Sequence, residues 1–130
     1  MKQGTRDRID SLVEESATAS RAEDFKVASV HRTEAAELCE LEESHAEAAG
    51  HYLGAADACC RAMIAGFEDP AEARACVKHA VEMVNAAANL IGKFPQLPEH
   101  LAATLAERRQ SVLYWLEKTK EVTPPVADDK

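Results

Sequence analysis

Apolar residues recur every three or four positions along most of this chain, which is the spacing of one face of an α-helix. The clearest run lies between residues 70 and 91, and its apolar positions are Ala73, Cys76, Val77, Ala80, Val84, Ala87, Ala88 and Ile91. No segment alternates between apolar and polar residues for long enough to indicate a strand. The pattern therefore predicts an all-α protein.

Helix starts can be placed from capping residues. Ser20, Ser44 and Asp69 each stand three residues before a Glu, the spacing at which a capping side chain and a Glu satisfy each other's backbone N–H groups. Pro70 strengthens the third start, because proline is favoured at the first helical position. Ser11 has the same spacing but lies inside an apolar run. Helix ends are predicted at two glycines, Gly66 and Gly92.

These signals divide the chain into five helical blocks, at about residues 5–19, 21–43, 44–66, 70–91 and 98–122. Because residues 5–49 contain no Gly or Pro, the first two blocks are compatible with one long helix or with two. Short connections favour antiparallel neighbours. We predict an antiparallel bundle, or stacked hairpins, of four to five helices in a single domain over residues 1–122. We expect the acidic tail, 123–130, to be disordered.

The same periodicity predicts which side chains form the core. Trp115 should be at least partly buried. The mostly buried positions should be Tyr52, Ala56, Cys59, Met63, Val77, Ala80, Val84, Leu105, Val112 and Leu116.

Charge and composition narrow the function classes. The formal net charge is −8, which argues against binding to nucleic acid or to an anionic membrane surface. No apolar run is long enough to span a membrane, and the N-terminus leads into no signal-peptide core, so we expect a cytoplasmic protein. The four cysteines form no C-x-x-C pair and are expected to be reduced and buried.

A short stretch of the chain resembles known helical hairpins. From Glu43 to Cys60, the spacing of Ala48, Tyr52 and Ala55 is similar to the small–aromatic–alanine pattern of tetratricopeptide hairpins. Residues 69–91 resemble the third helix of microtubule-interacting-and-trafficking domains, so the resemblance covers about residues 35–91. It implies a non-catalytic module that binds peptides or helices in a groove between its own helices.

An acidic stripe is the candidate partner-binding surface. Glu40, Glu43 and Glu47 step by three or four residues towards His51 and would share one face of a continuous helix. Such a face is either solvated or receives a basic partner. We predict that these three glutamates bind the partner.

An alternative interpretation is a metal-binding bundle. Glu42 and His45 form one Glu-x-x-His motif, and ferritin-like proteins need two, so a homodimer would have to supply the second copy. Ser44 argues against this motif, because a cap there would break the helix. The cysteines are a second possibility, but the adjacent Cys59 and Cys60 point about 100° apart on a helix and do not easily reach one metal.

Motifs for catalysis are absent from the sequence: there is no nucleophile elbow, no phosphate-binding glycine loop and no His-Glu-x-x-His. The leading hypothesis is therefore a non-enzymatic module without a cofactor, which binds another protein or peptide. An adaptor, a regulator and an inhibitor all fit this description, and a homo-oligomer is compatible with it.

Overall fold

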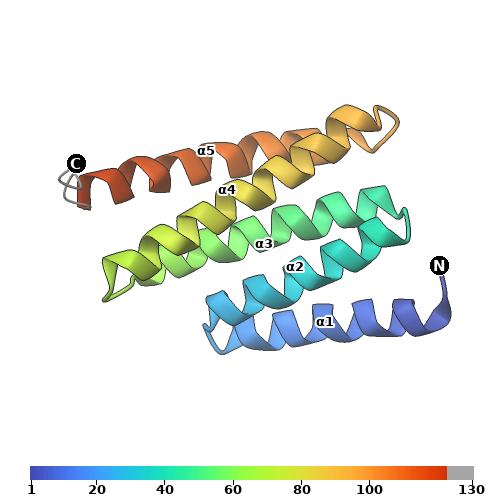
Figure 1. The fold of residues 1–130 in the computed structure, drawn as a ribbon, viewed down its shortest axis with the longest axis horizontal. Coiled ribbons are helices and arrows are strands. Elements are labelled where there is room, and N and C mark those ends of the chain that lie inside the picture. The colour runs from blue at the N-terminus through green and yellow to red at the C-terminus, as the bar shows by residue number, and fades with distance from the viewer. Residues whose placement is uncertain (123–130) are drawn as a thin grey trace.

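The described part of the protein consists of five antiparallel α-helices joined by short turns. The computed structural model describes residues 1–122, with side chains to residue 120. The helices are α1 (Gln3–Arg21), α2 (Phe25–Leu41), α3 (His45–Ala65), α4 (Pro70–Lys93) and α5 (Glu99–Val122) (Figure 1). Because no strand occurs in the described part, the prediction of an all-α fold is confirmed. The predicted disorder of residues 123–130 lies outside the described residues.

The helices follow one another in space as they do along the chain. Each helix packs against the next, and α3 also packs against α5. Within the described residues, α1 and α3 pack directly against each other at few points only. Figure 1 shows α1 at one edge of the array and α5 at the other, with α3 between them. Because α2 packs against both α1 and α3, a space remains between α1 and α3, and α2 lines one side of it.

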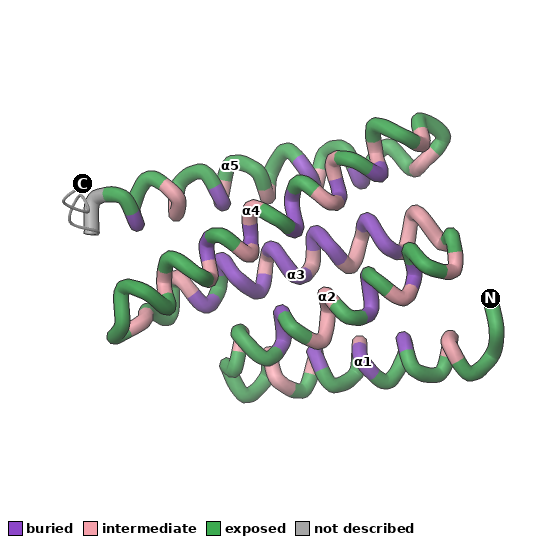
Figure 2. Tube along the Cα trace, in the orientation of Figure 1, coloured by how far each residue is buried: buried purple, intermediate pink, exposed green. Residues whose placement is uncertain are grey.

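Small side chains on α3 form the centre of the core. Figure 2 shows this helix buried over much of its length. Alanine side chains let neighbouring helix backbones approach closely, so α3 can be enclosed by α2, α4 and α5. The buried residues of α3 are Ala48, Ala49, Tyr52, Leu53, Ala55, Ala56, Ala58, Cys59, Cys60 and Ala62.

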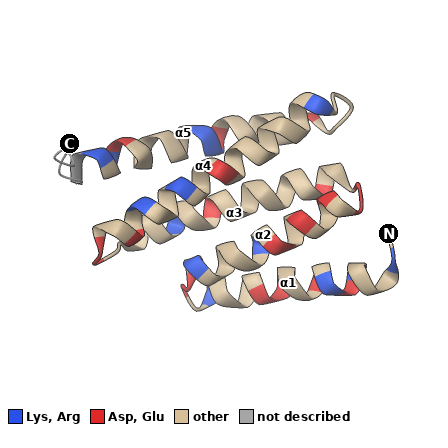
Figure 3. Ribbon diagram, viewed as in Figure 1, with Lys and Arg blue, Asp and Glu red and all other residues tan. Residues whose placement is uncertain are grey.

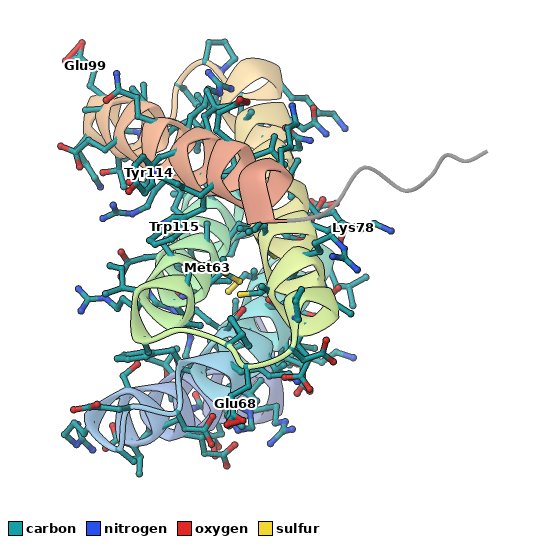
Figure 4. The ribbon with its side chains drawn as sticks, turned by 90° about the vertical axis from the view of Figure 1, so that its left-hand side faces the viewer. Met63, Glu68, Lys78, Glu99, Tyr114 and Trp115 are labelled. Atoms are coloured by element: carbon teal, nitrogen blue, oxygen red, sulfur yellow. The ribbon has the colours of Figure 1, made fainter. Side chains whose placement is uncertain are left out.

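Most of the predicted core is confirmed. Eight of the ten residues expected to be mostly buried are buried, whereas Met63 and Leu116 are only partly buried. Trp115 is partly buried, as expected. Figure 4 shows Met63 of α3 and Trp115 of α5 near the end of the array, where both line a small cavity with a volume of about 170 Å³. Met63 is therefore in contact with this cavity and is not fully enclosed by its neighbours.

The first two blocks are two helices, separated by a turn that the sequence did not reveal. Ser20 does not begin a helix, which corrects the prediction, because α1 continues to Arg21. The next helix starts instead after Asp24, whose carboxylate accepts a hydrogen bond from the Val27 N–H. Glu23, in the turn between the two helices, adopts a left-handed backbone conformation with a φ of 61°.

The remaining boundaries agree more closely with the prediction. Asp69 caps α4 by accepting the Ala71 N–H at 2.9 Å, and Pro70 is the first residue of that helix. Gly66 ends α3 with a φ of 97°. Gly92, however, lies inside α4, which ends at Lys93, so this predicted helix end is wrong. The helix extends past Gly92 because Phe94 still donates its N–H to Leu90 and its ring is held by stacking on another helix.

Candidate functional site

A groove runs between α1 and α3 and has α2 as its floor. Its volume is about 710 Å³. Phe25 and Arg32 of α2 form the floor, and the exposed Ile64 lies on the α3 wall. The groove exists because α1 packs along α2 and leaves this part of α3 uncovered.

Arg32 is the central polar residue of the groove. Its Nε donates a hydrogen bond to Nδ1 of His51 at 2.9 Å, which fixes the side chain between α2 and α3. The guanidinium lies flat against Gly54, where an added Cβ would stand 2.6 Å from Arg32 Cζ. A glycine in the middle of a helix costs about 1 kcal/mol, and here its missing side chain makes the room for Arg32.

The two terminal nitrogens of Arg32 remain available to a ligand. Within the described part of the chain, neither donates to another side chain, and the residue lines the groove. Burial lowers the pKa of Arg32, whereas nearby Asp57 raises it. An arginine stays charged in proteins. The groove therefore holds a fixed cation with unused hydrogen-bond donors.

The other charges of the groove largely compensate one another. Arg21, Arg61, Glu23 and Asp57 complete its charged lining. Asp57 is already paired, with Arg61 at 2.9 Å and Arg108 at 3.7 Å. Figure 3 shows the acidic residues spread over the rest of the molecule, especially on α1, α2 and the turns. Arg32 thus gives the groove a local positive charge in an acidic protein.

The predicted acidic stripe is divided among three elements. Glu40 lies at the end of α2, where its Oε1 accepts the Tyr52 hydroxyl at 2.6 Å. Glu43 lies in the turn that follows, and Glu47 lies in the first turn of α3. Because the helix breaks between them, the three carboxylates do not line one helical face. Only Glu40 and Glu43 are exposed, and Glu47 is half-buried.

Glu47 is held by an arginine from α1. Arg6 donates to both carboxylate oxygens, at 2.8 and 2.6 Å, and the Ser44 hydroxyl donates to Oε1 at 2.7 Å. These hydrogen bonds lower the pKa of Glu47 to about 2. Ser44 thus stands at the start of α3, as predicted, but its hydroxyl binds the Glu47 carboxylate and caps no backbone N–H. The pair links the N-terminal part of α1 to the first turn of α3, outside the groove.

Cys39, Glu47 and His51 come together as a possible ligand group, with one donor atom of each within 4.8 Å of the others. Two of the three residues are already engaged, however, since Arg6 donates to both oxygens of Glu47 and Arg32 donates to Nδ1 of His51. Burial and the Arg32 charge lower the pKa of His51 to about 4, and burial raises that of Cys39 to about 11. Two guanidinium groups beside these donors disfavour a metal cation. The group is better described as a polar network that joins three helices.

The residues of the alternative metal site are not brought together into a ligand set. Glu42 ends α2 and accepts the backbone N–H of Lys2 at 3.4 Å, whereas the His45 ring stacks on Phe94 with centroids 3.7 Å apart. The helix break that Ser44 suggested lies between the two residues. Among the described residues, neither belongs to a converging group of three ligands.

The two adjacent cysteines face different neighbours. Cys59 contacts the hydroxyl of Ser29 on α2, with Sγ and Oγ 3.2 Å apart. Cys60 lies near Asp57 and Arg108, and its burial raises its pKa to about 11. A single metal bound by this adjacent pair is therefore disfavoured by geometry.

Sequence reasoning missed the two arginines that connect α3 to its neighbours. Arg32, in the groove, and Arg6, outside it, look like ordinary surface arginines, and their partners lie far away in sequence. The one available signal was Gly54, a glycine within a strong helical pattern that has no role in a turn.

Comparison with known proteins adds no assignment: no protein-family model, curated protein or solved structure matches this chain. The resemblance of residues 35–91 to tetratricopeptide and microtubule-interacting-and-trafficking hairpins therefore stays a prediction. None of the described helices is both long enough and apolar enough to cross a membrane.

Proposed function

We propose that this protein is a non-catalytic helical module, which binds a segment of another polypeptide in the groove between α1 and α3. The observation that carries the proposal is Arg32, a half-buried cation whose terminal donors line an otherwise partly apolar groove. Charged groups held in such positions contribute strongly to recognition because they are already desolvated and oriented.

The chemistry of the groove favours a particular kind of segment. A carboxylate, from an acidic side chain or from a chain terminus, would accept two parallel hydrogen bonds from the guanidinium of Arg32. Neighbouring apolar side chains would pack against Phe25 and Ile64. We therefore propose an amphipathic peptide with an acidic group as the ligand, in contrast to the basic partner that the acidic stripe would receive.

Selection of peptides provides the test. A display library of short random peptides with free C-termini is selected on the purified protein, and the recovered peptides are measured by fluorescence anisotropy. We expect them to contain carboxylates and to lose about tenfold or more in affinity on Arg32→Gln, because a hydrogen bond to a charged group contributes ~1.5–3 kcal/mol. Arg32→Lys should also weaken binding, since lysine cannot form the bidentate contact.

Two control variants separate this groove from other surfaces. Arg109→Gln removes an exposed arginine of α5 that does not line the groove, and we expect it to leave the affinity unchanged. Glu43→Lys changes an exposed position of the acidic stripe. If Glu43→Lys abolishes binding of the selected peptides while Arg32→Gln does not, the partner surface is the acidic turn and the groove proposal is wrong.

A further inference from the structure

Two cysteines from neighbouring helices meet at a second cavity, away from the groove. Cys76 of α4 directs its Sγ to the backbone carbonyl of Cys59 on α3, at 3.4 Å. The two cysteines are therefore direct neighbours across α3 and α4, although 17 residues separate them in sequence. Figure 4 looks along α3 and α4 from the end where the turn around Glu68 connects them.

The sulfurs are accessible to a small molecule. Cys59 and Cys76 line the same cavity, which has a volume of about 200 Å³ and walls from α2, α3 and α4. Cys76 is partly exposed, whereas Cys59 is buried and lines this cavity. A water molecule occupies about 30 Å³, so a molecule of similar size has room to reach both sulfurs.

The surroundings make the two thiols unequal. The neighbouring Cys76 thiol lowers the pKa of Cys59, and so does the Ser29 hydroxyl, whose Oγ lies 3.2 Å from the Cys59 sulfur. Burial and the neighbouring Cys59 sulfur raise the pKa of Cys76. A thiolate is the nucleophilic form of cysteine. Cys59 is therefore the sulfur prepared to react first, and Cys76 is next to it.

We propose that Cys59 and Cys76 form a redox site, in which hydrogen peroxide, which is small enough to enter this cavity, oxidises the two thiols to a disulfide between α3 and α4. In the first step the Cys59 thiolate attacks one peroxide oxygen. The O–O bond breaks, the departing hydroxide takes up a proton to become water, and Cys59 carries a sulfenic acid.

In the second step the Cys76 sulfur attacks the sulfenyl sulfur of Cys59. The S–S bond forms, the S–O bond breaks, and hydroxide leaves as water with the proton of the Cys76 thiol. In sum, two thiols and one hydrogen peroxide give one disulfide and two waters. The peroxide gains the two electrons that the sulfurs lose.

The test uses the full chain, reduced and then treated with one equivalent of hydrogen peroxide. We expect the intact mass to fall by two hydrogen atoms and a peptide map to show a Cys59–Cys76 link, both reversed by dithiothreitol. Cys76→Ser should stop at a sulfenic acid on Cys59, which dimedone traps. Cys39→Ser and Cys60→Ser should still form the bridge, because Cys39 is buried elsewhere and Cys60 does not line this cavity.

The wild-type peptide map decides the proposal even if a variant folds poorly. A bridge that joins other cysteines, or oxidation that proceeds to sulfinic acid without any bridge, would overturn it. So would an equal loss of hydrogen atoms from Cys59→Ser and the wild type, with both shown to be folded by circular dichroism.

Discussion

Glu23 and Glu43 occupy backbone conformations that usually require glycine. Their φ angles are 61° and 59°, in the left-handed region. In both turns the residue after the glutamate donates its N–H back into the preceding helix, from Asp24 to Ala19 and from Ser44 to Cys39. This hydrogen bond is typical of the Schellman end of a helix, where glycine is the favoured residue. The two turns are therefore equivalent, and each is strained at its glutamate.

Replacing either glutamate by glycine should stabilise the protein. A left-handed conformation costs a non-glycine residue ~1–2 kcal/mol, and the greater freedom of glycine in the unfolded chain offsets part of the gain. We expect Glu23→Gly and Glu43→Gly each to raise the free energy of unfolding by about 0.5–1 kcal/mol in urea denaturation. Glu42→Gly is the matched control, because Glu42 has a φ of −90° and should gain nothing. Equal effects at residues 42 and 43 would show that strain is not the cause.

At the scale of elements, α3 has two glycines that serve different purposes. Gly50 and Gly54 lie one turn apart in the interior of the helix. A Cβ at Gly50 would meet nothing within 4 Å, whereas at Gly54 it would collide with the guanidinium of Arg32. Replacement by alanine at Gly50 therefore tests helix propensity alone, whereas the same replacement at Gly54 also disturbs the packing of Arg32.

We expect Gly50→Ala to raise the free energy of unfolding by about 1 kcal/mol, the difference in helix propensity between the two residues. Gly54→Ala should gain clearly less, because the displaced Arg32 loses its hydrogen bond to His51. Urea denaturation of both variants measures the difference. The peptides selected on the groove should bind Gly50→Ala normally and Gly54→Ala weakly. An equal stabilisation by both alanines would mean that Arg32 moves aside without cost.

At the scale of the whole molecule, three helices meet in the polar network around Glu47 and His51. The pKa of His51 is lowered to about 4, so the unfolded chain binds a proton more readily than the folded one between pH 4 and 6.5. The pKa of Glu47 is lowered to about 2, and its stabilising effect is complete above pH 4.5. Stability is therefore expected to fall on acidification, first through His51 and then through Glu47.

Chemical denaturation at a series of pH values tests this order. Between pH 6.5 and 4 we expect the free energy of unfolding to decline with the slope of a single proton, at most about 1.4 kcal/mol per pH unit. In His51→Gln the amide oxygen can still accept the hydrogen bond from Arg32 but does not titrate, so the decline should flatten there. If His51→Gln keeps the full slope, the pH dependence of the free energy of unfolding comes from other titratable groups.

The helical architecture could be predicted from the sequence because it depends on local chemistry. Periodic apolar residues, the Asp69–Pro70 start and the Gly66 end act within a few residues along the chain. Even so, the break at Glu23 was hidden, because an uncommon left-handed glutamate replaced the usual glycine signal. The acidic stripe depended on a continuous helix, and the second turn, at Glu43, interrupts it.

Tertiary structure alone decided which side chains meet. Arg32, His51 and Gly54 come together because of the way in which α2 packs against α3. The same packing places Arg32 in the groove beside α1. Cys59 meets Cys76 and not its neighbour Cys60 for the same reason. Spacing along a chain determines which residues share a helical face, but tertiary packing decides which faces of separate helices contact each other. The candidate sites lie where two such faces meet, so no local sequence pattern could predict them.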